Sequence, residues 1–292
     1  MKKSMRPDEA LKARFEHDGL VFPIPVLEAD EAAQYLSSYE AMVAARGGRL
    51  PKAFNAKTHL LVPWLWDLVH DPRVVDVVEE VLGPDILCWG TSFITKHGGD
   101  GRYVTWHQDA THWKLSSPEA VTAWVALTPS DRNNGCVRAV PGTHHVQLAH
   151  DHPEDPNNML GRREQVVADI DEETAVDIVL RPGEMSIHHP LIIHGSEPNL
   201  SSGPRVGFAI RYIPASIRQL DGLENSATLV RGRDHGTFVL EQEPEGEFHP
   251  EAVKRHRMVL RRGMSVIFGD AVPPAEVNGG ALHEGQKLDP SV

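Results

Sequence analysis

From residue 86 onward the chain breaks into short runs of β-prone residues separated by Gly, Pro, Asn and Asp, and this rhythm restricts the possible folds most. The expected strands are Ile86–Thr95, Arg102–His107, Ala120–Leu127, Cys136–Val140, Val176–Leu180, Met185–His188, Leu191–His194 and Arg205–Ile213. About eight short strands of this kind predict a mainly β fold, arranged as one barrel or sandwich with flanking helices.

The residues before this point have helical patterns instead. Expected helices are Asp8–His17, Glu28–Ala45, Leu60–His70 and Pro72–Leu82, with Gly or Pro near their ends. We predict one domain over 1–292, with a helical lead-in at 1–85, a β core at 86–215 and a C-terminal extension at 216–292. The segment 150–173 is polar and rich in Asp, Pro and Asn, so we expect a lid loop there.

Charge and hydropathy exclude several classes of partner. Lys and Arg number 29 against 41 Asp and Glu, giving a net charge of −12 without a basic stripe, so nucleic acid and membranes are not expected partners. No apolar run approaches the roughly 18 residues of a membrane span, and no signal-peptide core follows the N-terminus, so we expect a cytoplasmic location. Cys88 and Cys136 lack metal or redox spacing and are expected to be buried thiols. The oligomeric state, monomer or homodimer, stays open.

One of the expected strands ends in two types of metal ligand. His107 and Asp109 are two residues apart, so in an extended strand their side chains point to one face and can hold one metal ion. His194 ends another expected strand, 85 positions later (194 − 109). Two histidines and one carboxylate on one face form the ligand set of non-haem Fe(II) oxygenases. We therefore predict that His107, Asp109 and His194 are the catalytic iron ligands.

An iron site of this kind needs electrons to activate O2, and 2-oxoglutarate is the common co-substrate that supplies them. The distal carboxylate of 2-oxoglutarate requires a cation in the pocket. Arg205 lies 11 residues after His194 (205 − 194) on the next apolar strand. Because a guanidinium matches a carboxylate in two parallel hydrogen bonds, we predict that Arg205 binds this co-substrate.

In this arrangement the sequence resembles the phytanoyl-CoA dioxygenase family of Fe(II)/2-oxoglutarate oxygenases. The matching segments are Trp106–Asp109, His194–Ser196, Arg205, Asn133–Cys136, Pro141–His144, Arg181–Glu184 and Phe15–Gly19, so the resemblance covers approximately residues 11–215. It implies a double-stranded β-helix, the jelly-roll or cupin-like fold. It also implies iron ligation by the His-Asp-His set and 2-oxoglutarate contacts from Arg205, Ser196 and Trp124, with Gln108 close by.

The resemblance implies an oxidoreductase that converts 2-oxoglutarate and O2 to succinate and CO2 while hydroxylating a C–H bond of a small molecule. Desaturation, cyclisation and epimerisation use the same iron chemistry and stay open. Related halogenases have Ala or Gly in place of the carboxylate, so Asp109 argues against halogenation. A rival class is a non-catalytic cupin-like protein that binds a metal or a ligand, although no fourth ligand that would close a structural metal site is evident.

Four residues are candidates for substrate binding. Lys96 precedes the metal-ligand strand, His112 and Trp113 follow the carboxylate, and Arg211 lies six positions after Arg205 (211 − 205), on the same strand face. An inward Lys and Arg suit an acidic or carbonyl-bearing substrate, whereas packing or a surface salt bridge is the alternative for each. Four other histidines are expected to be structural or solvent-facing: His144, His145, His188 and His189.

Overall fold

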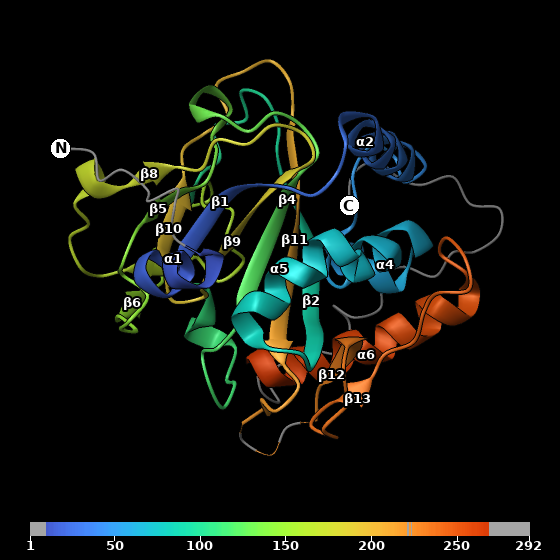
Figure 1. The fold of residues 1–292 in the computed structure, drawn as a ribbon. Helices are drawn as coiled ribbons and strands as arrows, with labels where there is room; N and C mark the ends of the chain where they lie inside the picture. The colour runs from blue at the N-terminus through green and yellow to red at the C-terminus, as the bar shows by residue number, and fades with distance from the viewer. Residues whose placement is uncertain (1–9, 221, 223, 269–292) are drawn as a thin grey trace.

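Two β-sheets make up the centre of the protein, and helices cover one side of the larger sheet (Figure 1). The computed structural model describes residues 10–220, 222 and 224–268. Within these residues the sheets do not close into a barrel, and they form the jelly-roll, or double-stranded β-helix, fold that the sequence predicts. The start of the helix expected at Asp8–His17 and the last part of the extension, 269–292, lie outside the described residues.

The larger sheet has seven strands. In spatial order they are β1 (Leu20–Pro25), β9 (Glu184–His188), β4 (Val121–Ala126), β11 (Arg205–Pro214), β2 (Ile86–Lys96), β12 (Ser226–Arg231) and β13 (Val239–Leu240). Neighbouring strands are antiparallel except β12 and β13, which are parallel. The long strand β11 therefore lies between β4 and β2, in the middle of the sheet.

The smaller sheet contains the strands of the two expected histidine ligands. Its order is β3 (Val104–His107), β10 (Ile193–Ser196), β5 (Arg138–Val140) and β8 (Val176–Asp177). The segment 150–173 is not an unstructured loop, because it contains the paired strands β6 (His150–Asp151) and β7 (Gln165–Val166).

Six α-helices and four short 3-10 helices are present in the described residues. They are α1 (Leu11–Asp18), α2 (Ala29–Ala44), α3 (Lys52–Asn55), η1 (Thr58–Leu60), α4 (Pro63–His70), α5 (Pro72–Leu82), η2 (Asp109–His112), η3 (Arg132–Asn134), η4 (Glu172–Thr174) and α6 (Pro250–Phe268). Local sequence explains the bounds of α5. The Asp71 side chain accepts a hydrogen bond from the backbone N–H of Arg73 at 2.9 Å, and Gly83 adopts a φ of 83° after the last turn.

Successive residues of β11 point to opposite faces of the larger sheet, one face toward the helices and the other toward the space between the two sheets. Val206, Phe208, Ile210 and Tyr212 point outward and join the core formed with α4 and α5. Burial of each large apolar side chain contributes roughly 1.5–3 kcal/mol, so this outer layer fixes the position of the strand. The alternate residues, among them Arg205 and Arg211, point inward between the two sheets.

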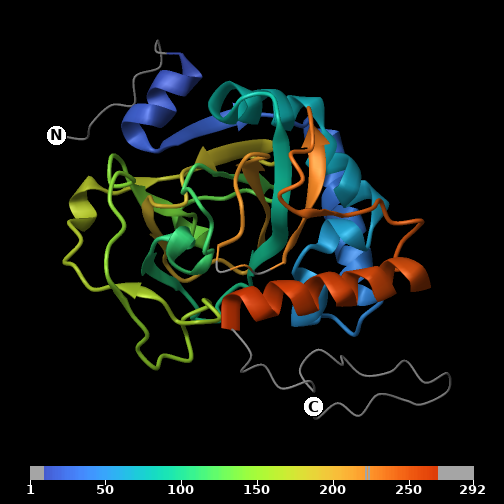
Figure 2. The same ribbon diagram turned by 90° about the horizontal axis from the view of Figure 1, so that it is seen from below.

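The larger sheet extends beyond the core expected at 86–215. Strand β1 comes from the predicted helical lead-in; it contains Pro23 and Pro25, and an edge position tolerates residues without a backbone N–H. Strands β12 and β13 come from the expected C-terminal extension. The same extension contains α6, whose C-terminal end lies beside the 150–173 segment (Figure 2).

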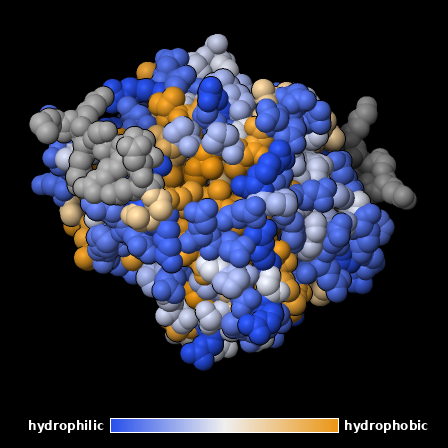
Figure 3. Space-filling model, viewed as in Figure 1, coloured by the Kyte–Doolittle hydropathy of each residue, from blue (hydrophilic) through white to orange (hydrophobic). Residues whose placement is uncertain are grey.

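No helix in the described part of the chain is long and apolar enough to cross a membrane. Hydrophilic residues predominate on the face shown in Figure 3, and apolar residues form limited patches between them. Cys88 and Cys136 are both buried and free, as the sequence predicts.

Candidate active site

The structure brings the three predicted metal ligands together between the sheets. Ligand atoms of His107, Asp109 and His194 all lie within 4.8 Å of one another. His107 is the last residue of β3, and His194 lies opposite it on β10. The prediction that Asp109 lies on the same strand as His107 is wrong, because β3 ends at His107 and Asp109 is the first residue of η2. The extended backbone of Gln108, with φ −121° and ψ 128°, still places Asp109 on the same side as His107.

Backbone carbonyls hold both histidine rings in one orientation. The Nδ1 of His107 lies 2.9 Å from the carbonyl oxygen of Thr105, and the Nδ1 of His194 lies 3.1 Å from that of Ile192. Because a carbonyl only accepts hydrogen bonds, each Nδ1 carries a proton and donates it. Each Nε2 is therefore left as the ligand atom, which is the outer-shell arrangement typical of metal-binding histidines.

The electrostatics of the cluster favour a charged carboxylate and a neutral second histidine. Burial raises the pKa of Asp109, but the neighbouring imidazoles of His107 and His188 outweigh burial and hold this pKa well below its ordinary value. Burial, followed by the charge of His107, lowers the pKa of His194 well below its ordinary value. An anionic carboxylate and a neutral imidazole are the forms that ligate metal ions.

Two further side chains complete the surroundings of the carboxylate. The hydroxyl of Thr122 donates a hydrogen bond to Oδ2 of Asp109 at 3.3 Å, and Nε2 of His188 lies 3.8 Å from the same oxygen. His188 is buried beside the triad, with its ring centroid 4.9 Å from that of His194. Of the two roles expected for His188, solvent-facing is therefore wrong, because its place on β9 turns it toward the cluster.

Arg205 lies on the inner face of β11 and is fully buried. Its Nη1 donates to the carbonyl of Gly135 at 2.7 Å, and its guanidinium lies 5.2 Å from the ring of Trp124. The Trp124 ring lies against Gly207, where an added Cβ would be 1.9 Å from the ring atom Cζ2. Only glycine at 207 therefore allows this ring to lie where it does, next to the guanidinium.

Several buried polar atoms on this inner face have no hydrogen-bond partner in the described structure. They are Nε and Nη2 of Arg205, Nε1 of Trp124, Oγ of Ser186 and both ring nitrogens of His188. Buried donors without acceptors each cost about 1–3 kcal/mol, so the face is arranged for a polar ligand rich in acceptors. A dicarboxylate such as 2-oxoglutarate fits this donor set. Burial lowers the pKa of Arg205 to about 10, which leaves it charged at neutral pH.

Ser196 and Gln108 differ in their fit to the predicted co-substrate site. Ser196 lies two residues after His194 on β10, is buried, and shares its face. The amide of Gln108 is already engaged, because its Nε2 donates to the carbonyls of Val146 and Leu191 and its Oε1 accepts from the N–H of Leu148. Its side chain therefore ties neighbouring loops together and is not free to bind 2-oxoglutarate.

A cavity of about 390 Å³ opens beside the ligands His107 and Asp109. This volume lies within the roughly 300–1,000 Å³ of small-molecule sites. Its walls come from β2, the turn after Asp109, the 150–173 segment and α6, and the lining residues include Trp89, Gly90, Trp113, Glu164, Arg211 and Val259. The predicted lid segment and the C-terminal extension therefore both contribute to the space beside the metal ligands.

Three of the four residues predicted to bind substrate line this cavity. They are His112, Trp113 and Arg211. Lys96 is placed differently, because its Nζ donates to the carbonyls of Ser196, at 2.9 Å, and Glu197. Burial, followed by the charge of Arg205, lowers the pKa of Lys96 to about 7. Lys96 therefore supports strand β10 on the Arg205 side, which corrects the expectation that it contacts substrate.

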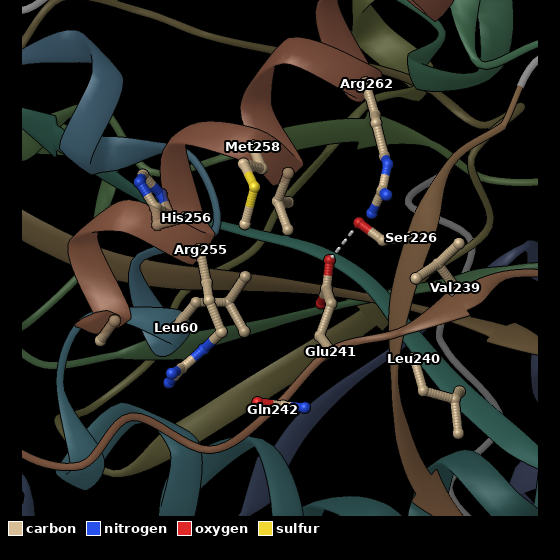
Figure 4. Close-up of a pocket in the computed structure, with 12 residues that line it drawn as sticks. Leu60, Ser226, Val239, Leu240, Glu241, Gln242, Arg255, His256, Met258 and Arg262 are labelled. Carbon is tan, nitrogen blue, oxygen red and sulfur yellow. Dashed lines mark hydrogen bonds between the residues drawn. The ribbon is translucent and has the colours of Figure 1, made fainter.

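A second, smaller cavity of about 110 Å³ lies between α6 and the strands β12 and β13 (Figure 4), and none of the three metal ligands lines it. Two of its lining residues are joined directly: Glu241 accepts a hydrogen bond from the hydroxyl of Ser226 at 2.8 Å. Glu241 also forms a buried ion pair with Lys57. This polar network fastens the segment that leads into α6 to the sheet. Since Lys57 also lines the larger cavity, the network supports the wall of the active-site space.

A family model described as phytanoyl-CoA dioxygenase (PhyH) matches residues 15–207, which is more than half of the chain. The chain belongs to this family of Fe(II)- and 2-oxoglutarate-dependent oxygenases. The family predicted from the spaced ligand motif and Arg205 is confirmed.

Individual relatives of the phytanoyl-CoA dioxygenase family agree with this assignment. The peroxisomal phytanoyl-CoA dioxygenase of Bos taurus is 34% identical over 158 residues, which cover 51% of this chain and 46% of the relative. The chain thus spans about half the length of the curated phytanoyl-CoA dioxygenases it matches.

Solved structures match more of the chain. The apo form of the non-haem monooxygenase ThoJ has a TM-score of 0.80 and 37% identity, covering 88% of this chain and 97% of its own. CytC3 with Fe(II) and α-ketoglutarate has a TM-score of 0.63 and 28% identity, covering 85% of this chain and 98% of its own. The predicted cofactors, Fe(II) and 2-oxoglutarate, agree with this bound pair and with the donor sets described above.

Proposed function

We propose that the protein hydroxylates a C–H bond of a small-molecule metabolite and releases succinate and CO2 from 2-oxoglutarate. The observation that carries this proposal is the position of Asp109, which supplies the third ligand beside a cavity of small-molecule size. In this proposal His107, Asp109 and His194 hold Fe(II), while Arg205, Ser196 and Trp124 hold 2-oxoglutarate.

Bound iron and 2-oxoglutarate would activate O2 and supply the oxidant that removes hydrogen from the substrate. The chain's own residues orient the metal ligands and the co-substrate. The carbonyls of Thr105 and Ile192 fix the two imidazoles, and Thr122 fixes the free oxygen of Asp109. The buried guanidinium of Arg205 would neutralise one carboxylate of the co-substrate and fix its direction in the site.

The identity of the third ligand and the lining of the cavity favour hydroxylation over other outcomes. A carboxylate at 109 occupies the position that a halide would need, which argues against halogenation. Epimerisation requires a side chain that returns a hydrogen atom to the substrate, and no Tyr or Cys is among the described residues that line the cavity. Desaturation and cyclisation would use the same metal ligands as hydroxylation, so identification of the product distinguishes the three reactions.

Anaerobic titration with Fe(II) and 2-oxoglutarate tests the proposed function. The protein should develop a weak visible charge-transfer band, and the variants Asp109→Ala and His194→Ala should lose it. The matched control is Arg257→Gln, an exposed position on α6, which should keep the band. With O2 and a substrate, succinate should form together with a product that carries one oxygen atom from O2. Absence of both the band and succinate would overturn the proposal.

A further inference from the structure

An irregularity in the central sheet lies beside the active-site cavity. Arg211 of β11 pairs with Gly90 of β2, but the next residue, Tyr212, pairs with Cys88. Trp89 is therefore an extra residue in β2, which is a β-bulge. Bulges redirect side chains and occur often next to active sites. Here Trp89, Gly90 and Arg211 all line the same cavity as His107 and Asp109.

One cation at this bulge has no ion pair within the described residues, and one buried hydrogen-bond donor has no acceptor there. The guanidinium of Arg211 donates through Nη1 to Oγ of Ser92 at 3.1 Å, and it forms no ion pair with any carboxylate of the described residues. The Nε1 of Trp89 is buried and has no partner in the same part of the chain. Because a buried donor without an acceptor costs about 1–3 kcal/mol, these groups favour a ligand that brings acceptor oxygens.

The carboxylates that line the cavity are already engaged. Asp109 accepts from Thr122 and lies within 4.0 Å of His107 and His188, as its predicted role as a metal ligand requires. Glu164 lies 3.3 Å from Nε2 of His112 and 3.8 Å from Nε of Arg162. The charge of Arg211 contributes to the lowered pKa of Asp109, but the two groups form no ion pair. The guanidinium can therefore pair directly with a group outside the chain, and a single positive charge matches a monoanion such as a carboxylate.

The same part of the cavity has an aromatic wall and open space. The rings of Trp89 and Trp113 lie 5.0 Å apart with an angle of 39° between their planes. An added Cβ on Gly90 would meet no atom within 4 Å, so this glycine leaves room above the sheet. Two indole rings next to an open position favour a planar, aromatic group, since stacking and edge contacts add to simple burial.

We propose that Arg211, Trp89 and Trp113 form a substrate-specificity subsite that binds a carboxylate attached to an aromatic skeleton. This inference rests on the proposed function, because the bound acid must place its C–H bond beside the triad. The guanidinium of Arg211 and the N–H of Trp89 bind the carboxylate, and the indole rings contact the aromatic group. Gly90 sets the largest size that fits.

A matched pair of probes tests this subsite. Under anaerobic conditions, protein loaded with Fe(II) and 2-oxoglutarate, so that Arg205 is occupied, is titrated with 3-phenylpropanoate and with its neutral amide, 3-phenylpropanamide. Tryptophan fluorescence and the visible band report binding without turnover. The acid should bind at least about ten-fold more tightly than the amide. Equal affinity for the two, or no binding of the acid, overturns the inference.

Three variants assign the preference to the named residues. Arg211→Gln should remove the preference for the acid, and the exposed control Arg257→Gln should keep it. Gly90→Val should lower the affinity for both probes, because its side chain fills the open space. If Arg211→Gln instead weakens binding of Fe(II), Arg211 serves Asp109 and not the substrate, and the inference fails. If the visible band never forms in the unmodified protein, the proposed function fails first, so the two failures are distinguishable.

Discussion

His194 on β10 lies directly opposite His107 on β3, and the centroids of the two rings are 4.1 Å apart. Both rings are held by backbone carbonyls, so their ligand atoms are positioned before any metal arrives. A preformed pair loses little conformational entropy when it binds an ion, which favours tight binding. The structure therefore predicts a site whose affinity depends on side chains that the backbone already orients.

We expect His194→Ala to weaken metal binding by at least about 100-fold, because loss of a direct ligand should exceed the 10–100-fold typical of outer-shell changes. Isothermal titration with Co(II) in place of oxygen-sensitive Fe(II) measures this change. The matched control is His145→Ala, an exposed histidine, which should bind Co(II) like the unmodified protein. Undiminished affinity of His194→Ala would remove His194 from the ligand set.

Arg205→Met should separate co-substrate binding from protein stability. The buried guanidinium leaves two nitrogens without partners, so an apolar side chain of similar length should not lower the melting temperature of the free protein. Loss of a charge-assisted hydrogen bond costs about 1.5–3 kcal/mol, which predicts a roughly 10- to 150-fold weaker affinity for 2-oxoglutarate. Thermal shift with increasing 2-oxoglutarate measures both effects, and an equal ligand-induced shift in the variant would contradict the role of Arg205.

The sequence could predict the metal ligands and Arg205 because their signals are local. The spacing of His107 and Asp109, and the strand context of His194, follow from the two-residue period of an extended chain. Strand β9 contains a similar two-residue pattern. Met185 and Ile187 face the helices, so Ser186 and His188 had to face the site.

Other parts of the site depend on contacts that no local pattern contains. The bulge at Trp89 exists only in the pairing of β2 with β11, and α6 reaches the cavity across more than 150 residues of chain from His107 (260 − 107 = 153 for Leu260). Gln108 follows a ligand in the motif, but strand alternation turns its side chain away, toward the carbonyls of neighbouring loops. The family resemblance implied a place for Gln108 close to 2-oxoglutarate, but it could not show which way this side chain points.

Gly207→Ala should disturb the co-substrate site more than any change at an open glycine. An added Cβ would lie 1.9 Å from the Trp124 ring, so the ring must move away from Arg205. Overpacking of this kind costs about 1–3 kcal/mol, and we expect weaker 2-oxoglutarate binding with it. Gly90→Ala is the matched control, since its Cβ meets nothing, and its free energy of unfolding should change by less than about 0.5 kcal/mol. Urea unfolding of both variants makes the comparison, and equal losses would contradict the steric account.

Acid should remove the stability that Glu241 contributes through its buried contacts. Burial raises the pKa of Glu241, but the charge of Lys57 and the neighbouring imidazole of His59 outweigh burial and lower this pKa to about 2. A carboxyl whose pKa is depressed on folding stabilises the protein above its ordinary pKa of 4.5 and loses this contribution as pH falls toward about 2. A shift of this size corresponds to about 3 kcal/mol.

Glu241→Gln should therefore lower the free energy of unfolding by about 3 kcal/mol at pH 7, because Lys57 is left buried without its partner. The difference from the unmodified protein should shrink as the pH falls from 5 toward 2. Urea unfolding at several pH values measures it. The control is Glu245→Gln, whose exposed ion pair with Arg255 is screened by solvent and should contribute little at any pH. If this difference in the free energy of unfolding does not change with pH, Glu241 stabilises the protein through packing alone, because a contribution from its charge must depend on proton binding.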